Sequence, residues 1–565
     1  MPRAAIPRER LAAALGKSLT DDELRDLLWT TKAEFDGSDG GSLTIEATAD
    51  RLDLLTEAGL ALALAPRVGG AHGLPPIAPG FWDGPPPVFE VDDSVSPLRP
   101  AIAGVIVQAP PERPLDAGLL DEAIRFQELL HATYGGDRRR ASLGVYPTDR
   151  FQFPVRYGLR PMAGTRFVPL DGTAEVDVAA FLREHPLGIR YGPLGVAGDR
   201  LLVLEDVDGV VLSLPPTLNS RTAGEARPGD RSLLIESTGM TEARVRETVG
   251  LLSLVFVANG WRVVPVGTRR SDSADDGEGV VAPRPLPITL ATLDAISGRR
   301  YTVPEGEHLL AESRLGAHPV AGGFSVEVPP WRPDLLTEVD VAEDVVLARG
   351  VRAEEGVVPP SATRGRRRPE TVFRRRFADL LLGLGYAELY TPLLVSREVD
   401  SLLAPTGAIA VANPVSELFS HVRNRLLPSL LTSLSHNVRH SYPQRVFEVG
   451  PVVVAEPSSE TGGRTLYRAG AVFAGEGAGF ADGAALLDYL SGAVAAVGVR
   501  EPVEIHGTIL GRAARLRLAG ESIGEVGEVH PSVLSALRIP VPVAWAELDV
   551  SALWPLARRG PEAPM

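Results

Sequence analysis

The sequence of 565 residues contains no cysteine and only two lysines, Lys17 and Lys32. The absence of cysteine excludes disulfide bonds, a thiol nucleophile and thiolate metal sites. The chain also has no apolar run of membrane-spanning length, and its first residues do not form the apolar stretch of a signal peptide. These absences predict a cytoplasmic protein without membrane segments, in which arginine carries nearly all of the positive charge.

Acidic residues outnumber basic ones, and the formal net charge is −15. This balance excludes a general nucleic-acid coat but leaves room for local basic patches. A chain of this length implies about four domains. Pro/Gly-rich and acidic stretches divide the sequence into an N-terminal module at 1–75, a mixed domain at 88–268, a second module at 284–358 and a C-terminal domain at 365–556. The expected fold class is α+β and multidomain.

Hydrophobic periodicity predicts several helices along the chain. The clearest cover residues 21–29, 56–65, 119–134, 242–259 and 371–383. Two apolar runs at 201–204 and 210–214 flank Asp208-Gly209, which is a strong hairpin signal.

Four carboxylates lie close together in the segment from Val328 to Asp344. Asp340, Glu343 and Asp344 stand at i, i+3 and i+4, which is one face of a helix, and Asp334 lies just upstream. Oxygen ligands of this kind suit Mg²⁺ better than zinc. The alternative is a capped helix, with Thr337 at the cap and Asp340 as its acidic partner, which would need no metal.

The sequence contains a second copy of this segment. Arg51-Leu52-Asp53-Leu54-Leu55-Thr56-Glu57 repeats Arg332-Pro333-Asp334-Leu335-Leu336-Thr337-Glu338 almost letter for letter. In the first copy, the positions that match the three helical acids are Gly59, Leu62 and Ala63. The module therefore forms without the acids, which favours a functional interpretation of the acids in the second copy.

Other strings along the chain are Ser213-Leu214-Pro215-Pro216-Thr217-Leu218-Asn219-Ser220, Asn413-Pro414-Val415-Ser416-Glu417, Tyr442-Pro443-Gln444-Arg445-Val446-Phe447-Glu448-Val449-Gly450 and Gly524-Glu525-Val526-Gly527-Glu528-Val529-His530-Pro531. Together with the acidic motif, and in this order, they resemble the β subunit of phenylalanyl-tRNA synthetase in its shorter archaeal and eukaryotic-type form. The first-copy motif departs from the family, which usually has Asn at the position of Asp50 and Pro at that of Leu52. This departure leaves a divergent paralogue open.

The resemblance implies an α subunit as partner in an α₂β₂ assembly, tRNA(Phe) as the RNA partner, and ATP and Mg²⁺ as cofactors. It implies that Asp334, Asp340, Glu343 and Asp344 hold the Mg²⁺. The C-terminal domain resembles the antiparallel-sheet fold of class II synthetases, but it has no GxGxGxxR motif for ATP. We therefore expect no adenylation residues in this chain, and an adenylate site in the α subunit.

The domain at 88–268 resembles the family's editing module, which would hydrolyse Tyr-tRNA(Phe). Matched to the family motif, Leu204, Ser213 and Asn219 fall on positions that line the editing pocket. Without that match, Ser213 would simply end a strand, and Asn219-Ser220 would be turn residues. Two other functions stay open: a free-standing aminoacyl-tRNA deacylase, and a non-enzymatic scaffold or tRNA-binding partner.

Arginine-rich runs occur at 138–140, 364–368 and 374–376. Such runs could contact tRNA phosphates. A solvated surface is the favoured interpretation in a chain that uses arginine for nearly every positive charge.

Overall fold

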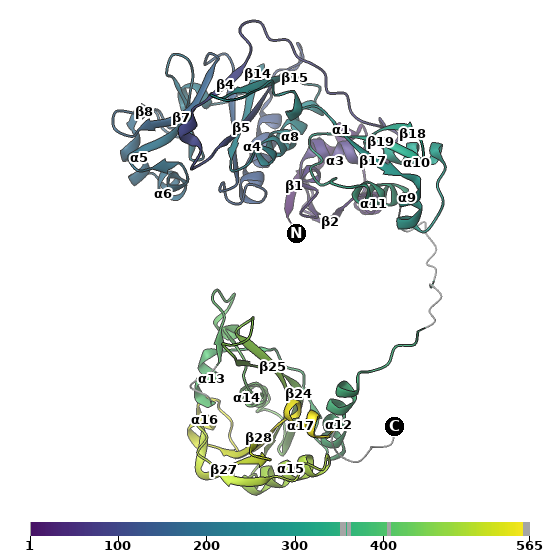
Figure 1. Ribbon diagram of the computed structural model, residues 1–565, viewed down its shortest axis with the longest axis vertical. Coiled ribbons are helices and arrows are strands. Elements are labelled where there is room, and N and C mark those ends of the chain that lie inside the picture. Colours follow the sequence, from purple (N-terminus) through teal and green to yellow (C-terminus); the bar gives the residue numbers. More distant parts are fainter. Residues whose placement is uncertain (1, 351–357, 359–362, 404–407, 558–565) are drawn as a thin grey trace. The chain divides into compact units, whose positions relative to one another are not determined.

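The structure is a computed structural model that describes residues 2–350, 358, 363–403 and 408–557. The chain divides into two compact units, Met1–Val358 and Pro359–Met565, and each is described by itself. Figure 1 shows the helices and strands of both units. None of the helices within the described ranges combines the length and apolar character needed to cross a bilayer.

The first unit begins with a small module, in which a three-stranded sheet of order β1-β3-β2 is covered by helices. Its elements are β1 (Arg3–Pro7), α1 (Arg8–Leu15), α2 (Asp21–Leu28), β2 (Ala33–Ser38), β3 (Ser42–Ala47), the 3₁₀ turn η1 (Leu52–Leu55) and α3 (Glu57–Leu64). The Thr20 side chain accepts from the backbone N–H of Glu23 at 3.2 Å and so caps α2, which begins one residue later.

The same order of elements recurs later in this unit. The second module contains β17 (Arg284–Thr289), α9 (Leu290–Ser297), α10 (Val303–Glu312), β18 (Gly316–Val320), β19 (Gly323–Val328) and α11 (Glu338–Arg349), with a sheet of order β17-β19-β18. The expectation of duplicated α/β modules is therefore confirmed in topology. The two copies belong to the same unit, and their contact is described below.

Between the modules lies a domain built on one large, curved sheet of eleven strands. Nine strands follow the order β13-β12-β11-β7-β4-β15-β5-β14-β6, so β6 and β13 end the path. They are β4 (Val88–Val91), β5 (Ala101–Gln108), β6 (Ala141–Pro147), β7 (Val155–Pro161), β11 (Arg200–Glu205), β12 (Val211–Leu214), β13 (Leu218–Asn219), β14 (Ser232–Gly239) and β15 (Arg262–Arg269). The short β10 (Val196–Ala197) and β16 (Ala274–Asp275) pair at the side, and β8 (Arg166–Phe167) and β9 (Val176–Asp177) form a separate pair.

Two long helices cover one face of this sheet (Figure 1). They are α4 (Ala117–Ala132) and α8 (Glu242–Val257), and α8 is almost entirely buried. Short helices α5 (Val178–Glu184), α6 (Pro186–Tyr191) and α7 (Arg221–Gly224) occupy the loops. The predicted hairpin is present, because β11 and β12 pair across the turn at Gly209, which has a φ of 83° that glycine adopts readily.

The second unit is built on a seven-stranded sheet of order β20-β24-β25-β29-β28-β27-β26. All neighbours are antiparallel except β20 and β24, which agrees with the expected class II-like sheet. The strands are β20 (Ala387–Glu388), β24 (Gln444–Ala455), β25 (Gly463–Ala474), β26 (Val499–Pro502), β27 (Thr508–Leu518), β28 (Glu521–Val529) and β29 (Val543–Asp549). A second sheet joins β21 (Leu394–Val395), β23 (His421–Val422) and β22 (Ile409–Ala410).

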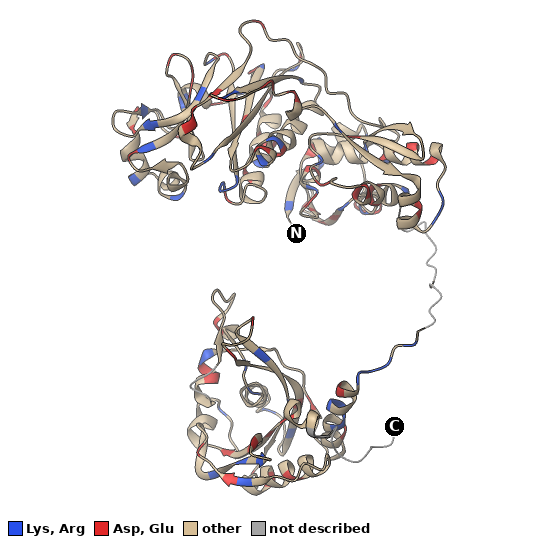
Figure 2. Ribbon diagram, viewed as in Figure 1, with Lys and Arg blue, Asp and Glu red and all other residues tan. Residues whose placement is uncertain are grey.

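Helices pack on both faces of the seven-stranded sheet. One face meets α12 (Pro369–Gly383), α15 (Phe480–Gly492) and α17 (Val550–Ala557) in one apolar core. The other meets α14 (Leu427–His436), with α13 (Arg397–Leu403) and α16 (Pro531–Ala536) beside it. Figure 2 shows a run of basic residues on the segment that leads into α12, where Arg364 and Arg366 to Arg368 are exposed.

Candidate functional site

A cavity of about 340 Å³ opens in the large-sheet domain, where the two ends of the sheet approach each other. Tyr146 on β6 donates its hydroxyl hydrogen to the Ser213 hydroxyl of β12 at 2.9 Å. The Asn219 side chain of β13 donates to the Val145 carbonyl of β6 at 3.3 Å. The curvature of the sheet therefore brings segments more than sixty residues apart to one pocket, whose size lies in the range of small-molecule sites.

The wall of the cavity is mostly apolar, with a few polar groups among the apolar ones. The wall is formed by α4, β6, β12, β13, β14, α8 and the loops between them. It includes Leu120, Ala123, Ile124, Glu128, His131, Arg138, Ser142, Leu143, Tyr146, Leu170, Ser213, Pro215, Asn219, Leu233, Glu236 and Phe256. An apolar wall with a few placed polar groups is the usual composition of a site for a ring-bearing ligand.

Of the three residues predicted for this pocket, Ser213 and Asn219 line the cavity. Asn219 also donates to the Gly224 carbonyl at 3.3 Å, so two carbonyls hold its amide group. Leu204 lies opposite Ser213 in the β11–β12 pairing, but it is fully buried in the core beneath the sheet and is not part of the cavity wall. The structure thus brings two of the three together and places Leu204 behind them.

The sequence-based prediction missed Glu236, which is the most unusual group in the cavity wall. It lies in the middle of β14, 2% exposed, between Gly104 of β5 and Gly144 of β6. Burial raises the pKa of Glu236 to about 8, although Arg99, the Gly144 N–H and Tyr146 favour its charged form. At neutral pH the carboxyl therefore holds a proton, and within the described residues its Oε2 has no hydrogen-bond partner.

Glycine at 144, which pairs with Glu236 across the strands, leaves room for the Tyr146 ring. A Cβ atom at this position would lie 2.1 Å from the Tyr146 hydroxyl, so any larger residue would displace that ring. The signal in the sequence was a single ionisable residue inside the run Ser232–Gly239, which otherwise reads as a buried strand.

Three charged or titratable side chains gather at another part of the wall. Glu128 accepts from both His131 and Arg138 at 3.1 Å, and these contacts lower the pKa of Glu128 to about 2, with the His131 hydrogen bond as the largest cause. The other nitrogen of His131, Nε2, accepts from the Leu143 backbone at 2.8 Å. The neutral ring therefore carries its proton on Nδ1, facing Glu128.

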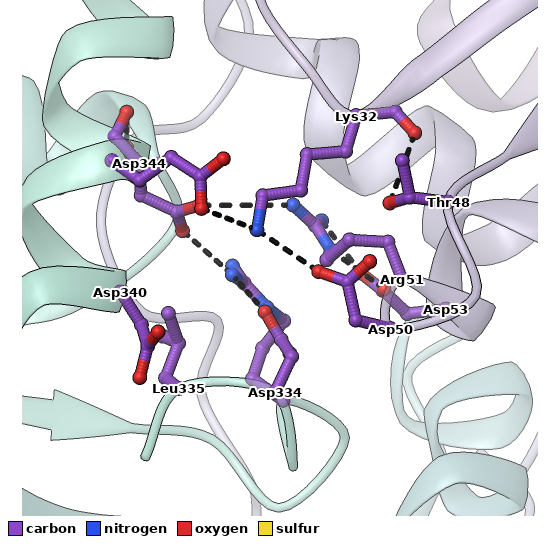
Figure 3. Close-up of polar contacts among 12 residues, drawn as sticks. Lys32, Thr48, Asp50, Arg51, Asp53, Asp334, Leu335, Asp340 and Asp344 are labelled. Carbon is purple, nitrogen blue, oxygen red and sulfur yellow. Dashed lines mark hydrogen bonds and ion pairs between the residues drawn. The ribbon is translucent and has the colours of Figure 1, made fainter. Parts of the chain in front are cut away.

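The four acids of the second module are bound by protein groups, and Figure 3 labels three of them, Asp334, Asp340 and Asp344. Asp334 forms a two-point contact with Arg332 at 2.9 and 2.7 Å, and Asp344 meets the same guanidinium at 2.7 Å. Asp340 accepts from the backbone N–H groups of Leu336 and Thr337 at 2.9 and 2.7 Å, which caps α11. Glu343 pairs with Lys32 of the first module at 2.7 Å.

These partners determine whether Mg²⁺ fits at the four acids. Burial opposes ionisation of Asp334, but Arg332 outweighs it and lowers the pKa of Asp334. The same pairing with Asp344 and Asp334 raises the pKa of Arg332 against its burial. Among the residues that the structure describes, no three His, Cys, Asp or Glu side chains are grouped to hold a metal ion. The four carboxylates do not converge, and this arrangement does not fit a shared Mg²⁺ ligand set.

Four arginines of the second unit are also matched by carboxylates. Arg468 pairs with Glu547 at 2.8 Å, Arg515 with Glu525 at 2.8 Å and Arg423 with Glu448 at 2.6 Å. Arg425 lies over the Trp545 ring and also reaches Glu525 at 3.3 Å. Guanidinium groups neutralised in this way are poorly placed to bind triphosphate oxygens.

Comparisons with known proteins agree with these features. Residues 286–351 match the tRNA synthetase B5 domain, and residues 355–550 match the CLM domain of the phenylalanyl-tRNA synthetase β chain. An N-terminal fragment of the phenylalanyl-tRNA synthetase β subunit from Pyrococcus horikoshii shares the fold, with a TM-score of 0.56 and 24% identity over 62% of this chain and 100% of that one.

Relatives of full length were also found. The phenylalanine–tRNA ligase β subunit of Pyrococcus furiosus is 28% identical over 98% of this chain and 100% of its own. The same subunit of Thermofilum pendens is 32% identical over 99% of this chain and 100% of its own. With that identity over nearly the whole of both sequences, the chain belongs to the family of phenylalanine–tRNA ligase β subunits.

Proposed function

We propose that the chain is the β subunit of an α₂β₂ phenylalanine–tRNA ligase in the cytoplasm, and that its large-sheet domain hydrolyses tRNA(Phe) mischarged with tyrosine. The observation that supports hydrolysis is the buried Glu236 carboxyl, whose Oε2 has no hydrogen-bond partner among the described residues, in the wall of a largely apolar cavity. ATP and Mg²⁺ serve the adenylate site, which we assign to the α subunit.

The chemistry explains why such a site is needed. A pocket built for phenylalanine cannot strongly reject tyrosine, which adds only a hydroxyl, so a second site must remove the wrong product. That second site can discriminate sharply if it hydrogen-bonds the phenol, because phenylalanine then leaves its buried polar groups unpaired.

Glu236 and Ser213 provide such groups. A protonated carboxyl can donate to the phenol oxygen with one atom and accept its hydrogen with the other. The Ser213 hydroxyl, already held by Tyr146, contributes a further donor or acceptor in the same wall. The surrounding leucine and phenylalanine side chains contact the ring without distinguishing the two amino acids.

Asn219 is the group we assign to the aminoacyl ester. Its NH₂ is held by the Val145 and Gly224 carbonyls, which fixes the plane of the amide. The amide oxygen therefore has a set direction and can accept from a water molecule beside the ester.

The test is hydrolysis of preformed Tyr-tRNA(Phe) by the purified αβ complex. Asn219→Ala should slow hydrolysis by about tenfold to a hundredfold, in the range expected for loss of a positioning group, while charging with phenylalanine is unchanged. Asn259→Ala is the matched control, because the Asn259 side chain donates to the Val255 carbonyl at the end of α8 and is not part of the cavity wall. Unchanged hydrolysis in Asn219→Ala would exclude this role.

A partner surface for the α subunit is available on the second unit. Large apolar side chains are exposed there, several of them in the segment around the small β21-β23-β22 sheet: Tyr390 (94%), Leu393, Val415, Leu418 and Phe419. Exposed apolar groups in such number favour a protein interface. Co-purification with a class II α subunit, lost in Tyr390→Asp, is the expected result.

A free-standing deacylase is the second candidate, because Ser213, Asn219 and Glu236 all lie in the large-sheet domain of the first unit. The two functions differ in a simple measurement. Hydrolysis by the chain alone, at the rate of the complex and without a bound α subunit, would favour the free-standing enzyme.

A further inference from the structure

The two copies of the duplicated module contact each other through charged side chains. Several of these are present in one copy and replaced by an apolar residue at the matching position of the other. Lys32 immediately precedes β2, and the residue that immediately precedes β18 in the second copy is Leu315. Glu343 and Asp344 on α11 match Leu62 and Ala63 on α3. The first copy thus supplies Lys32 where the second has an apolar residue, and the second supplies Glu343 and Asp344 where the first has apolar residues.

Lys32 is held between two carboxylates, one from each copy (Figure 3). Its Nζ lies 2.9 Å from Asp50 Oδ2 and 2.7 Å from Glu343 Oε2, and its side chain is 12% exposed. The backbone carbonyl of Lys32 accepts from the Thr48 N–H at 3.0 Å, which ties it to the end of β3. Two carboxylates from different copies therefore contact one ammonium group.

A deeper layer of the same contact uses arginines from both copies. Asp344 meets Arg332 at 2.7 Å and Arg51 at 4.0 Å, and each arginine also holds the aspartate two residues on in its own copy. All of these groups are at least nine-tenths buried. Asp344 of the second module therefore contacts both Arg51 and Arg332, which occupy matching positions in the two copies.

The use of lysine at position 32 fits this geometry. The chain has 57 basic residues, of which lysine accounts only for Lys17 and Lys32. A guanidinium is a rigid planar fork, whereas an ammonium is a compact point charge with rotatable donors that two carboxylates can approach from different sides. In size and charge density, the lysine ammonium group resembles a metal cation more closely than a guanidinium group does.

We propose that the ammonium group of Lys32 takes the place of a divalent metal ion at the acidic signature, by which we mean Asp334, Asp340, Glu343 and Asp344. The two modules are then joined without Mg²⁺. Glu343 then binds lysine, and Asp334 and Asp344 bind arginine. This proposal concerns the joining of the modules and does not depend on hydrolysis in the cavity.

The test is thermal unfolding of the purified full chain, with hydrogen exchange of α11 and β2 to locate the transition. Lys32→Ala should lower the Tm of that transition by about 2 °C, the size expected when a modest ion-pair contribution is lost from a large unit. Lys17→Ala is the matched control, since Lys17 lies 3.9 Å from the exposed Glu23 within one module. Equal Tm values for the two variants would refute the proposal.

Mg²⁺ and Mn²⁺ provide the second arm at constant ionic strength. The unaltered chain should have the same Tm in EDTA and in millimolar MgCl₂, and a saturable rise with Mg²⁺ would overturn the proposal. Lys32→Ala leaves Asp50 and Glu343 facing an empty position, so either ion should raise its Tm towards that of the unaltered chain. If neither ion raised the Tm of Lys32→Ala, the two carboxylates would need no cation at this position. That result would also refute the proposal that Lys32 replaces a metal ion.

Discussion

Replacement of Glu236 by glutamine separates the charge of this residue from its shape. Glutamine has nearly the same volume and keeps one donor and one acceptor, but it does not titrate. In the folded chain, burial holds the pKa of Glu236 at about 8, against an ordinary value of 4.5. Between these two pH values the native state keeps a proton that the unfolded state has lost.

The sign and size of the effect follow from proton linkage. Because the native state binds more protons in this window, the free energy of unfolding falls as the pH rises from about 4.5 to 8. At about 1.4 kcal/mol per pH unit, the shift amounts to about 5 kcal/mol over the whole window and about 3 kcal/mol by pH 7. Glu236→Gln should therefore match the unaltered chain near pH 4.5 and become progressively more stable than it towards pH 8.

Urea unfolding of both proteins at several pH values measures this difference, with hydrogen exchange of the β14 amides to report the large-sheet domain. Other titrating groups, including Glu122, whose pKa burial also raises to about 8, are present in both proteins and cancel in the comparison. A stability difference that stays constant from pH 5 to pH 8 would refute the buried, protonated state of Glu236 and remove the basis for its contact with a phenol.

Two further predictions concern the module contact and the tRNA. Asp344→Ala should destabilise the first unit by about 3 kcal/mol, because it leaves Arg332 and Arg51 buried beside one carboxylate fewer. Glu338→Ala removes a half-buried acid of the same helix, which accepts from the Thr289 backbone at 3.4 Å and contacts neither arginine, and it should change the stability less. Equal effects of the two substitutions would contradict the assignment. Arg139 and Arg190, both more than 60% exposed near Arg138 of the cavity wall, pair with Asp137, and we propose that they also contact phosphates of the tRNA 3′ end. Reversing both to Glu should raise the KM for Tyr-tRNA(Phe) and flatten its salt dependence, with little effect on kcat; an unchanged salt dependence would exclude that contact.

The elements of the fold could be predicted where local pattern decides them. The helices α2, α3, α8 and α12 begin within two residues of their expected starts, because caps and apolar periodicity mark them. The hairpin at Gly209 and the repeated order of elements in the two modules were also readable from short-range signals. These features depend on residues within one or two turns of each other.

The cavity could be predicted only in part, because it depends on the curvature of the whole sheet. Ser213 and Asn219 were found through resemblance, but nothing local indicates that Glu236 would meet Tyr146 from β6 or that β6 would approach β12 and β13. Leu204 shows the opposite case, since its neighbour across the strand pair lines the cavity while Leu204 itself packs into the core.

The acidic signature shows how far spacing alone can determine a site. Positions i, i+3 and i+4 place three Cα atoms on one face of α11, but the three carboxylates bind different groups. Asp340 accepts from backbone N–H groups at the helix start, Glu343 pairs with Lys32, and Asp344 pairs with Arg332. A divalent ion that used Asp334 and Asp344 would have to displace Arg332, whose guanidinium is buried and bound by both. Since an unpaired buried guanidinium is costly and Mg²⁺ gives up its water reluctantly, the ion-paired arrangement is the more stable of the two.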